Sequence, residues 1–379
     1  MATKENKRRC DILVTYCWNR VGYNIVKSLS NQGLSVWVAD TSKYNICSLS
    51  KYSSGSFTYP NPFKHEDEFI KFLVLKVKEL KPICLLPTHD ESIIIAKHRE
   101  LFPKDLIIPI DNYQKLITLS DKKDATELAQ SLGVPVPRIF DNIDTIEKYP
   151  IVCKTRIGNS AKGVFFPNDK HELEEYVEKF GKGNMLLEEK IGGTDHSVDC
   201  FRWGNTFYAS VYKALVTKTE GGGTTTQRVI VNVPMLVDYA KKILDSVDFY
   251  GVCGMDFRYD TKTNEVGFIE VNARYTGGLA TPIAAGFNIP WIHYCAAIGK
   301  DIPANINIKE GTKTKWILGD IITLVGRCLS FSFNKSEMKT LFNFDFDYFD
   351  DYDKHDKKAF LGELLYYLCK LIKNRKLNP

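Results

Sequence analysis

The sequence of 379 residues lacks the features that mark several large classes of protein. No apolar run approaches the ~20 residues that a membrane-spanning helix needs. The basic stretch from Lys4 to Arg9 is followed by a segment broken by charge, which argues against a secretory signal. The ten cysteines are scattered and form no CxxC pair, so we expect neither a disulfide framework nor a zinc site. A cytoplasmic protein without a membrane partner is the resulting expectation.

A strong excess of charge of one sign is also missing. The net charge is +5, and no basic stripe is interleaved with aromatic residues, so nucleic acid is not an expected partner. Apolar residues make up 44% of the chain and charged residues 26%, which is ordinary for a globular protein. The length allows two or three domains with a substantial core.

Strand-like and helix-like patterns alternate in the first third of the chain. Alternation of this kind predicts a parallel sheet within residues 1–118. A dinucleotide fingerprint would need GxGxxG after the first strand, but Thr15 to Tyr23 supplies only Gly22, which weakens a nicotinamide-binding interpretation. The apolar segments that carry the pattern are residues 11–16, 21–29, 34–39 and 83–87.

The most informative segment is Gly267 to Arg274. An apolar run, Val266 to Ile269, precedes Glu270, Asn272 and Arg274, and side chains at alternate positions of a strand point the same way. Carboxylate and amide oxygens suit Mg²⁺, and a guanidinium suits a phosphate or carboxylate beside the metal. The pattern therefore predicts a magnesium site, although a solvated face of a hairpin would show the same alternation.

The preceding segment, Gly254 to Tyr259, is predicted to be the partner strand of a hairpin that turns through Asp260 to Glu265. Such a hairpin would bring Asp256 to the same place as a second acidic ligand.

Three further segments are compatible with binding of a triphosphate, each with an ordinary alternative. Lys154 ends an apolar strand and faces a loop, Ile157 to Gly163, that resembles a phosphate cradle with Ser160 as a donor, or a plain hairpin. Glu188 to Ile191, followed by Asp195, could hold an adenosine or could be a charged strand end with a glycine turn. Glu220 to Thr226, flanked by Lys213 and Arg228, suits a lid or a long hairpin loop.

Two polar segments remain outside these patterns. His89-Asp90-Glu91 follows a short apolar strand, where it could line the substrate edge of a cleft or begin a helix. The acidic, aromatic stretch 345–353 is expected to form a loop on the surface.

The order of these features resembles the ATP-grasp superfamily, in its carboxylate–amine ligase and carbamoyl-phosphate-synthase-like branch. The residues that carry the resemblance are Asp121-Lys122, Lys154 with its glycine/serine loop, Glu188 to Ile191 with Asp195, Asp256, and Glu270 to Gly278. The resemblance covers roughly residues 10–300 of the sequence.

The resemblance implies an α/β and α+β architecture. Residues 1–118 would form a Rossmann-like pre-ATP-grasp domain with a parallel sheet. Residues 119–305 would form the ATP-grasp domain, with subdomains at 119–185 and 186–305 that clamp ATP, the second carrying the metal site. Residues 306–379 would be a mostly helical C-terminal extension without a catalytic motif.

The resemblance also implies roles for single residues. Lys122 and Lys154 would hold the α- and β-phosphates of ATP, and the loop containing Ser160 and Gly163 would close over the β/γ end. Adenine would contact the backbone between Glu188 and Ile191, a segment that includes Glu189 and Lys190. The ribose would contact Asp195, which is one methylene shorter than the glutamate common in the family. Two Mg²⁺ ions, with Mn²⁺ as a substitute, would bind Asp256, Glu270 and Asn272.

Three cationic residues complete the implied catalytic set. Arg274 would stabilise an acyl phosphate, while Arg228 and Lys213 would contact the γ-phosphate or the substrate carboxylate.

The implied activity is ADP-forming ligation of a small-molecule carboxylate to an amine through an acyl phosphate, by an enzyme that could form a homodimer. Two alternatives remain open: a carbamoyl-phosphate-synthase-like enzyme that forms carboxyphosphate, and a regulatory ATP-binding protein that keeps the fold without catalysis.

Overall fold

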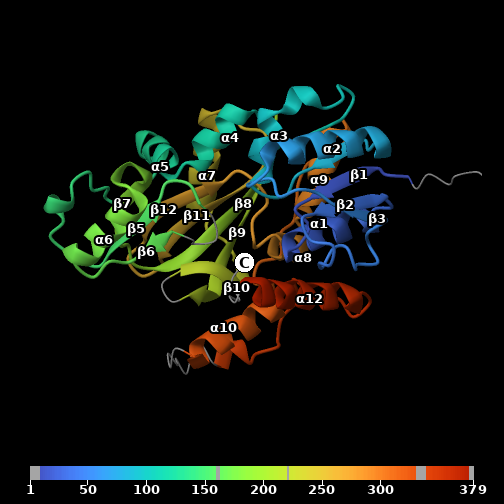
Figure 1. The fold of residues 1–379 in the computed structure, drawn as a ribbon. Coiled ribbons are helices and arrows are strands. Elements are labelled where there is room, and N and C mark those ends of the chain that lie inside the picture. Colours follow the sequence, from blue (N-terminus) through green and yellow to red (C-terminus); the bar gives the residue numbers. More distant parts are fainter. Residues whose placement is uncertain (1–8, 159–162, 220–221, 330–338, 375–379) are drawn as a thin grey trace, which may run out of the picture.

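The computed structural model describes residues 9–158, 163–219, 222–329 and 339–374. Its N-terminal part, blue in Figure 1, contains a four-stranded parallel sheet in the order β3-β2-β1-β4, as the sequence predicts. The strands are β1 (Ile12–Thr15), β2 (Val36–Asp40), β3 (Gly55–Thr58) and β4 (Cys84–Leu86).

Helices cover both faces of this sheet, which explains why every residue of β1 is buried. Ile12 and Val14 pack in the same cluster as residues of α1, whereas Leu13 packs with residues of α2. The N-cap of α1 is Asn19, whose side chain accepts hydrogen bonds from the amides of Val21 and Gly22. The helices of this part are α1 (Arg20–Asn31), α2 (Glu66–Leu80), α3 (Glu91–Lys97) and α4 (Tyr113–Ser120).

A small three-stranded antiparallel sheet, in the order β6-β5-β7, forms a separate lobe that is green in Figure 1. This lobe has its own core, in which Ile151, Cys153 and Leu187 pack against Leu173 of the lobe's helix. The elements are β5 (Ile151–Thr155), β6 (Val164–Phe165), α6 (Lys170–Phe180) and β7 (Met185–Glu189).

The largest sheet has seven strands in the order β12-β11-β8-β9-β10-β13-β14. One face is apolar and packs against α7, while the opposite face carries the polar side chains of the predicted site. The strands are β8 (Thr194–Trp203), β9 (Thr206–Thr219), β10 (Gly222–Val231), β11 (Gly251–Asp260), β12 (Glu265–Asn272), β13 (Lys313–Lys315) and β14 (Tyr348–Phe349). The helices around it are α5 (Lys122–Ser131), α7 (Pro234–Ser246), α8 (Ala280–Ala284) and α9 (Ile289–Ala297).

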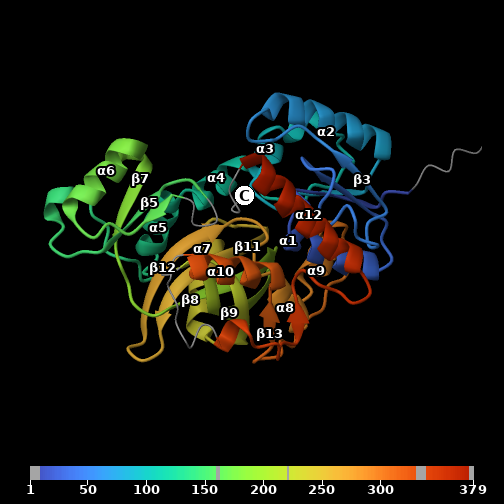
Figure 2. The same cartoon turned by 60° about the horizontal axis from the view of Figure 1, so that its bottom comes forward.

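The C-terminal segment is helical, as the sequence predicts, but it also contributes β13 and β14 to the large sheet. Its helices are α10 (Ile317–Leu329) and α12 (Lys357–Asn374), and Figures 1 and 2 both place α12 beside the N-terminal domain. The expected architecture is therefore confirmed, with a C-terminal segment more integrated than predicted. The predicted domain limit at residue 118 falls inside α4. Over the described ranges, no helix is long and apolar enough to cross a membrane.

Candidate active site

The predicted hairpin of β11 and β12 brings three polar side chains together. Asp256 lies opposite Glu270 in the antiparallel register, and Gly254 lies opposite Asn272. The amide nitrogen of Asn272 is 3.2 Å from a carboxylate oxygen of Asp256 and 3.3 Å from one of Glu270. The alternation read from the sequence therefore places all three on one face.

The two carboxylates of this cluster lie in a setting that favours a cation. Burial, and then the charge of Glu270, raises the pKa of Asp256 well above its usual range. Ser197 of β8 donates a hydrogen bond to Asp256 and so limits this shift. Two adjacent carboxylates and an amide are the hard oxygen donors that Mg²⁺ prefers, so the residues fit a magnesium site.

The two predicted phosphate-binding lysines both reach this hairpin. Lys122, at the start of α5, lies 3.2 Å from Glu270 and donates a 2.7 Å hydrogen bond to the carbonyl of Gly158. Lys154, in β5 of the small lobe, donates a 2.9 Å hydrogen bond to the carbonyl of Ile269. Both side chains are buried, so two ammonium groups from different lobes lie next to the carboxylates.

The side chain of Glu188 forms a contact that the sequence did not predict. It is buried and forms a 2.8 Å ion pair with Lys154. Burial raises the pKa of Glu188, and Lys154 opposes that shift. The resemblance implied only a backbone contact of Glu188 with adenine, and this ion pair was not predicted because the sequence did not indicate that β5 and β7 are neighbours.

The remaining residues of the expected adenosine segment lie where the small lobe joins the large sheet, between β7 and β8. Glu189 and Lys190 are exposed, and the side chain of Ile191 covers Gly267, where a Cβ atom would lie 1.9 Å from it. Asp195 is only partly exposed and forms a 2.7 Å ion pair with Arg258, a partner that the sequence analysis missed. If Asp195 binds a ribose, its carboxylate would therefore contact both the ribose and Arg258.

The phosphate loop can be described only at its ends. Ser160 lies outside the described residues. Gly163 has a positive φ of 83°, and its carbonyl accepts a 2.9 Å hydrogen bond from the amide of Thr155. A Cβ atom at Gly163 would lie 2.6 Å from the Thr155 hydroxyl, so this end of the loop requires glycine.

Arg274 lies just beyond β12 and reaches the N-terminal domain. Its guanidinium donates a 2.6 Å hydrogen bond to Asp90 and a 3.2 Å hydrogen bond to the carbonyl of Tyr275. Asp90 begins α3 but makes no capping hydrogen bond with its side chain. His89 to Glu91 lie at the start of α3, where the carboxylate of Glu91 accepts a 3.0 Å hydrogen bond from the amide of Thr88, so the helix-start interpretation is supported.

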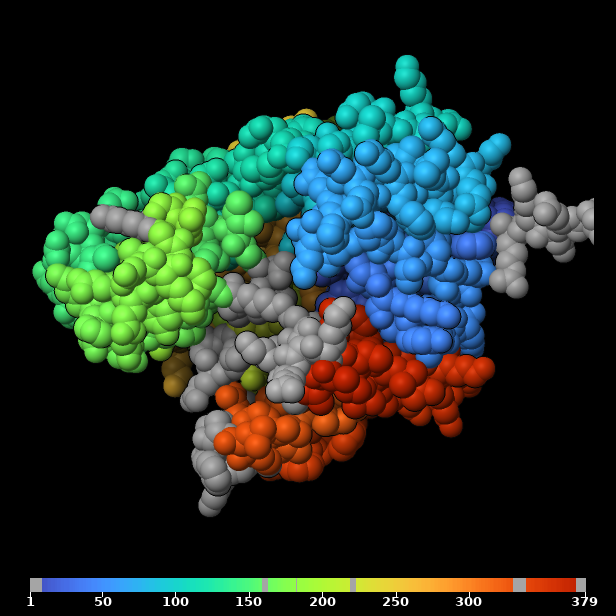
Figure 3. All heavy atoms as spheres, in the orientation of Figure 1, coloured from blue at the N-terminus to red at the C-terminus, as the bar shows by residue number. Residues whose placement is uncertain are grey.

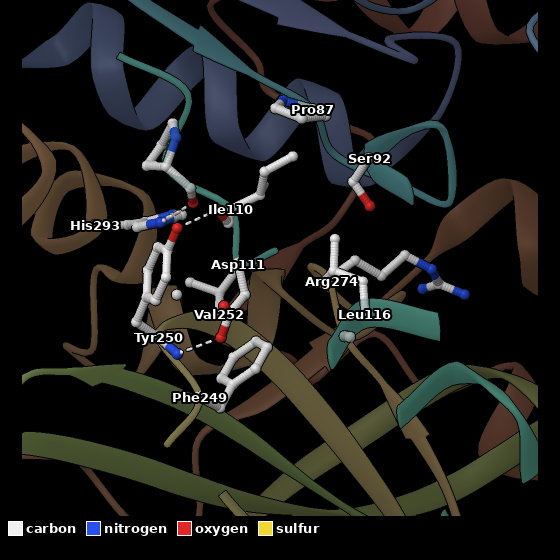
Figure 4. Close-up of a pocket in the computed structure, with 13 residues that line it drawn as sticks. Pro87, Ser92, Ile110, Asp111, Leu116, Phe249, Tyr250, Val252, Arg274 and His293 are labelled. Carbon is white, nitrogen blue, oxygen red and sulfur yellow. Dashed lines mark hydrogen bonds between the residues drawn. The ribbon is translucent and has the colours of Figure 1, made fainter. Parts of the chain in front are cut away.

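The stem of Arg274 lines a closed junction between the N-terminal domain and the large sheet (Figure 4). The cavity there is about 10 Å³, room for about one water molecule. Tyr250 ties the junction together by donating hydrogen bonds from its hydroxyl to Ile110 (2.7 Å) and from its amide to Asp111 (2.9 Å). Burial lowers the pKa of His293 in the same wall to about 4, so this ring is neutral near pH 7.

Two of the predicted catalytic cations do not face a substrate. Arg228 is fully buried, where it pairs with Asp350 of the C-terminal segment and donates a 3.0 Å hydrogen bond to Thr281. Lys213 lies on the same face of β9 as Val211, which is the apolar face packed against α7. The catalytic roles expected for both residues are therefore wrong. Arg228 is buried in an ion pair with Asp350, and Lys213 lies on the apolar face of the sheet, opposite the site.

The segment 220–226 was expected to be a lid or a hairpin loop. Residues 220–221 lie outside the described part of the chain, and those on either side belong to the paired strands β9 and β10. The described residues therefore match the hairpin alternative.

Comparisons with known proteins find similarity in sequence and in fold. Residues 182–319 match a family described as ATP-grasp in the biosynthetic pathway with Ter operon. The chain is 35% identical over 78 residues to a D-alanine–D-alanine ligase of Fusobacterium nucleatum, covering 21% of this chain and 26% of the relative. It is 24% identical over 214 residues to a carbamoyl-phosphate synthase of Methanobrevibacter smithii, covering 52% of this chain and 57% of the relative.

The fold is also found among solved structures. The biotin carboxylase domain dimer of Hydrogenobacter thermophilus 2-oxoglutarate carboxylase, solved with MgADP, ADP and bicarbonate, superimposes with a TM-score of 0.64. That match has 16% identity and covers 80% of this chain and 73% of the other.

The chain thus spans between a quarter and three fifths of the two curated relatives. The solved structure and this chain therefore share a fold, and residues 182–319, which include the β11–β12 hairpin, match an ATP-grasp family.

Proposed function

We propose that the protein is an ATP-dependent, ADP-forming ligase that activates a carboxylate as an acyl phosphate and joins it to an amine. The observation that carries the proposal is the convergence of Asp256, Glu270 and Asn272 with two buried lysines from separate lobes. Arg274 lies two residues beyond the same strand and reaches Asp90 of the N-terminal domain. Such a set concentrates hard ligands and positive charge where a triphosphate and a carboxylate could meet.

Each group has a physical role in this proposal. Asp256, Glu270 and Asn272 would hold magnesium, which when bound supplies charge neutralisation for phosphoryl transfer. Lys122 and Lys154 would exchange part of their contact with Glu270 and Glu188 for phosphate oxygens. Their location in different lobes means that binding of a triphosphate would hold the lobes together.

Arg274 would stabilise the acyl phosphate. Asp90 and the carbonyl of Tyr275 fix two faces of its guanidinium, which reduces the entropy lost when a substrate anion binds. Because the fork is planar, it can bind two oxygens of a phosphate or carboxylate at once. Asp90 is thus a positioning residue that reaches the site from the N-terminal domain.

The test is a screen of amino-acid and organic-acid pools for release of ADP in the presence of ATP and Mg²⁺. We expect ADP release that depends on a carboxylic acid, and hydroxylamine should trap the acyl phosphate as a hydroxamate. A Glu270→Gln variant serves as the matched inactive control. Release that depends on bicarbonate alone would favour carboxyphosphate formation, as the similarity to carbamoyl-phosphate synthase allows. ATP binding without ADP release under any acid would favour the regulatory alternative and contradict the proposal.

A further inference from the structure

A second cavity, of about 520 Å³, lies between the N-terminal domain and α12. On one side it is lined by residues that follow β2 and β3, including Ser42, Tyr59 and Lys64, and on the other by Tyr366 and Lys370 of α12. Figure 3 shows the N-terminal domain (blue) directly against α12 (red). Open parallel sheets bind ligands at the carboxyl ends of their strands, and the volume lies in the range of small-molecule sites.

The charge of this cavity is of one sign. Lys64 and His65 approach it from the N-terminal domain and Lys370 from α12, and no carboxylate is among the described residues that line it. Asp40, at the end of β2, does not line the cavity. Its carboxylate accepts hydrogen bonds from the amides of Trp18 (3.1 Å) and Ser42 (3.0 Å). The cavity therefore presents cations and hydroxyl groups to an anion.

The two tyrosines that line the cavity already contact other residues. Tyr366 already stacks on Trp18, at a centroid distance of 4.8 Å, and the ammonium of Lys370 lies 5.4 Å from its ring. The hydroxyl of Tyr59 accepts a 2.9 Å hydrogen bond from the amide of Tyr16. Recognition would therefore rest on charge and hydrogen bonds, which favours an oxygen-rich anion over an aromatic molecule.

A series of neighbouring side chains connects this cavity to the candidate active site. Tyr16, which is bonded to Tyr59 on the cavity side, stacks on His89 with a centroid distance of 4.5 Å. The next residue, Asp90, is the partner of Arg274. Tyr59, Tyr16, His89 and Asp90 thus form a continuous series of neighbours from the cavity to the guanidinium that would stabilise the acyl phosphate.

We propose that this cavity binds the anionic end, carboxylate or phosphate, of a substrate of the proposed ligase, with Lys64 and Lys370 as the specificity-determining cations. The assignment to a substrate rests on the proposed function, whereas anion binding in the cavity does not.

Cysteine labelling tests anion binding without any need for catalysis. Cys369 lines the cavity and is exposed, Cys328 on α10 is exposed elsewhere, and the other eight cysteines are buried. We expect glutarate or glycerol 3-phosphate to slow alkylation of Cys369 by iodoacetamide about fivefold or more at near-saturation, with Cys328 unaffected and uncharged glycerol without effect. The anion that protects Cys369 more strongly shows whether the cavity prefers a carboxylate or a phosphate. Equal labelling of Cys369 with and without both anions would overturn the proposal.

Substitutions then test the link to the substrate. Lys64→Gln and Lys370→Gln should each raise the KM for the acid or amine found in the screen about tenfold, because each removes one charge-assisted contact. The KM for ATP should be unchanged, and Lys64→Arg should restore most of the affinity. Lys104→Gln and Lys358→Gln, at exposed lysines of the same domain and the same helix outside the cavity, are the matched controls.

The outcomes separate the two proposals. Protection of Cys369 with an unchanged substrate KM in both variants would overturn the assignment to a substrate. If no acid supports ADP release but Cys369 is protected, the proposed function fails while anion binding in the cavity stands.

Discussion

The β11–β12 hairpin and the segment 345–353 are both acidic, yet the fold uses their carboxylates in opposite ways. On the hairpin, Asp256 and Glu270 lie beside each other on a partly open face, and the nearest cation is Lys122 at 3.2 Å from Glu270. In the segment, Asp350 is fully buried between the guanidinium groups of Arg20 and Arg228. Two adjacent carboxylates whose negative charge is not fully balanced by nearby cations are suited to bind an added cation. A buried carboxylate whose charge is already balanced by guanidinium groups of the protein serves the fold instead.

The Asp350 pairs also connect three parts of the chain. Arg20 belongs to α1 of the N-terminal domain, and Arg228 belongs to β10 of the large sheet. Asp351, next in sequence, accepts hydrogen bonds from the amides of Ile317 and Leu318 at the start of α10. The expectation that residues 345–353 form a surface loop is therefore wrong for these aspartates, which are buried because their partners come from elsewhere.

The sharpest test of this contrast is Asp350→Asn. Removing the charge leaves two buried guanidinium groups without compensation, which should lower the free energy of unfolding by about 3–5 kcal/mol. Urea denaturation followed by circular dichroism measures the effect. Asp347→Asn is the matched control, since Asp347 is about half exposed and its nearest cation is 3.9 Å away. Equal stability of the two variants would contradict the structural role of Asp350.

The corresponding change on the hairpin is Glu270→Gln. It should lower kcat for ADP release about 10²–10³-fold, since an interaction needed in the transition state is lost. Stability should stay the same or rise, because the change also removes repulsion with Asp256. The control is Glu265→Gln at the exposed start of the same strand. Undiminished ATP hydrolysis by the Glu270→Gln variant would refute the metal assignment.

Glu91 is a buried carboxylate that is held by neutral hydrogen-bond donors, in contrast to the hairpin and to Asp350, and the change expected at this residue is the smallest of the three. It is fully buried and accepts hydrogen bonds from the Thr15 hydroxyl (2.7 Å) and the Thr88 amide (3.0 Å), and burial raises its pKa to about 7. Because the folded state holds this proton more tightly than the unfolded state, the contribution of Glu91 to stability falls as pH rises from about 4.5 to about 7.

The Glu91→Gln variant should lack this dependence. Its stability relative to the native protein should therefore increase across that interval, by roughly 2–3 kcal/mol. Denaturation curves at pH 5 and pH 7.5 measure the difference, and parallel changes in both proteins would refute the assignment.

Much of the candidate site was predictable because its geometry is local. The two-residue period of a strand places Glu270 and Asn272 together, and a short turn brings Asp256 opposite them. Lys213 was assigned from its place beside the segment 220–226 and from the resemblance, without regard to strand alternation, and the structure puts it on the apolar face of β9. Lys122 and Lys154 came from the resemblance to a family, and the structure places both beside the hairpin.

By itself, the sequence determined the parallel sheet of the first domain, the acidic hairpin and the order of motifs that marks the superfamily. Only the tertiary structure decided which charges meet. Asp90 and Arg274 are 184 residues apart, and Asp350 lies 330 residues from Arg20 and 122 from Arg228. Whether a carboxylate serves a ligand or the fold depends on the cation that packing brings within about 4 Å, and that distance is set by contacts between domains.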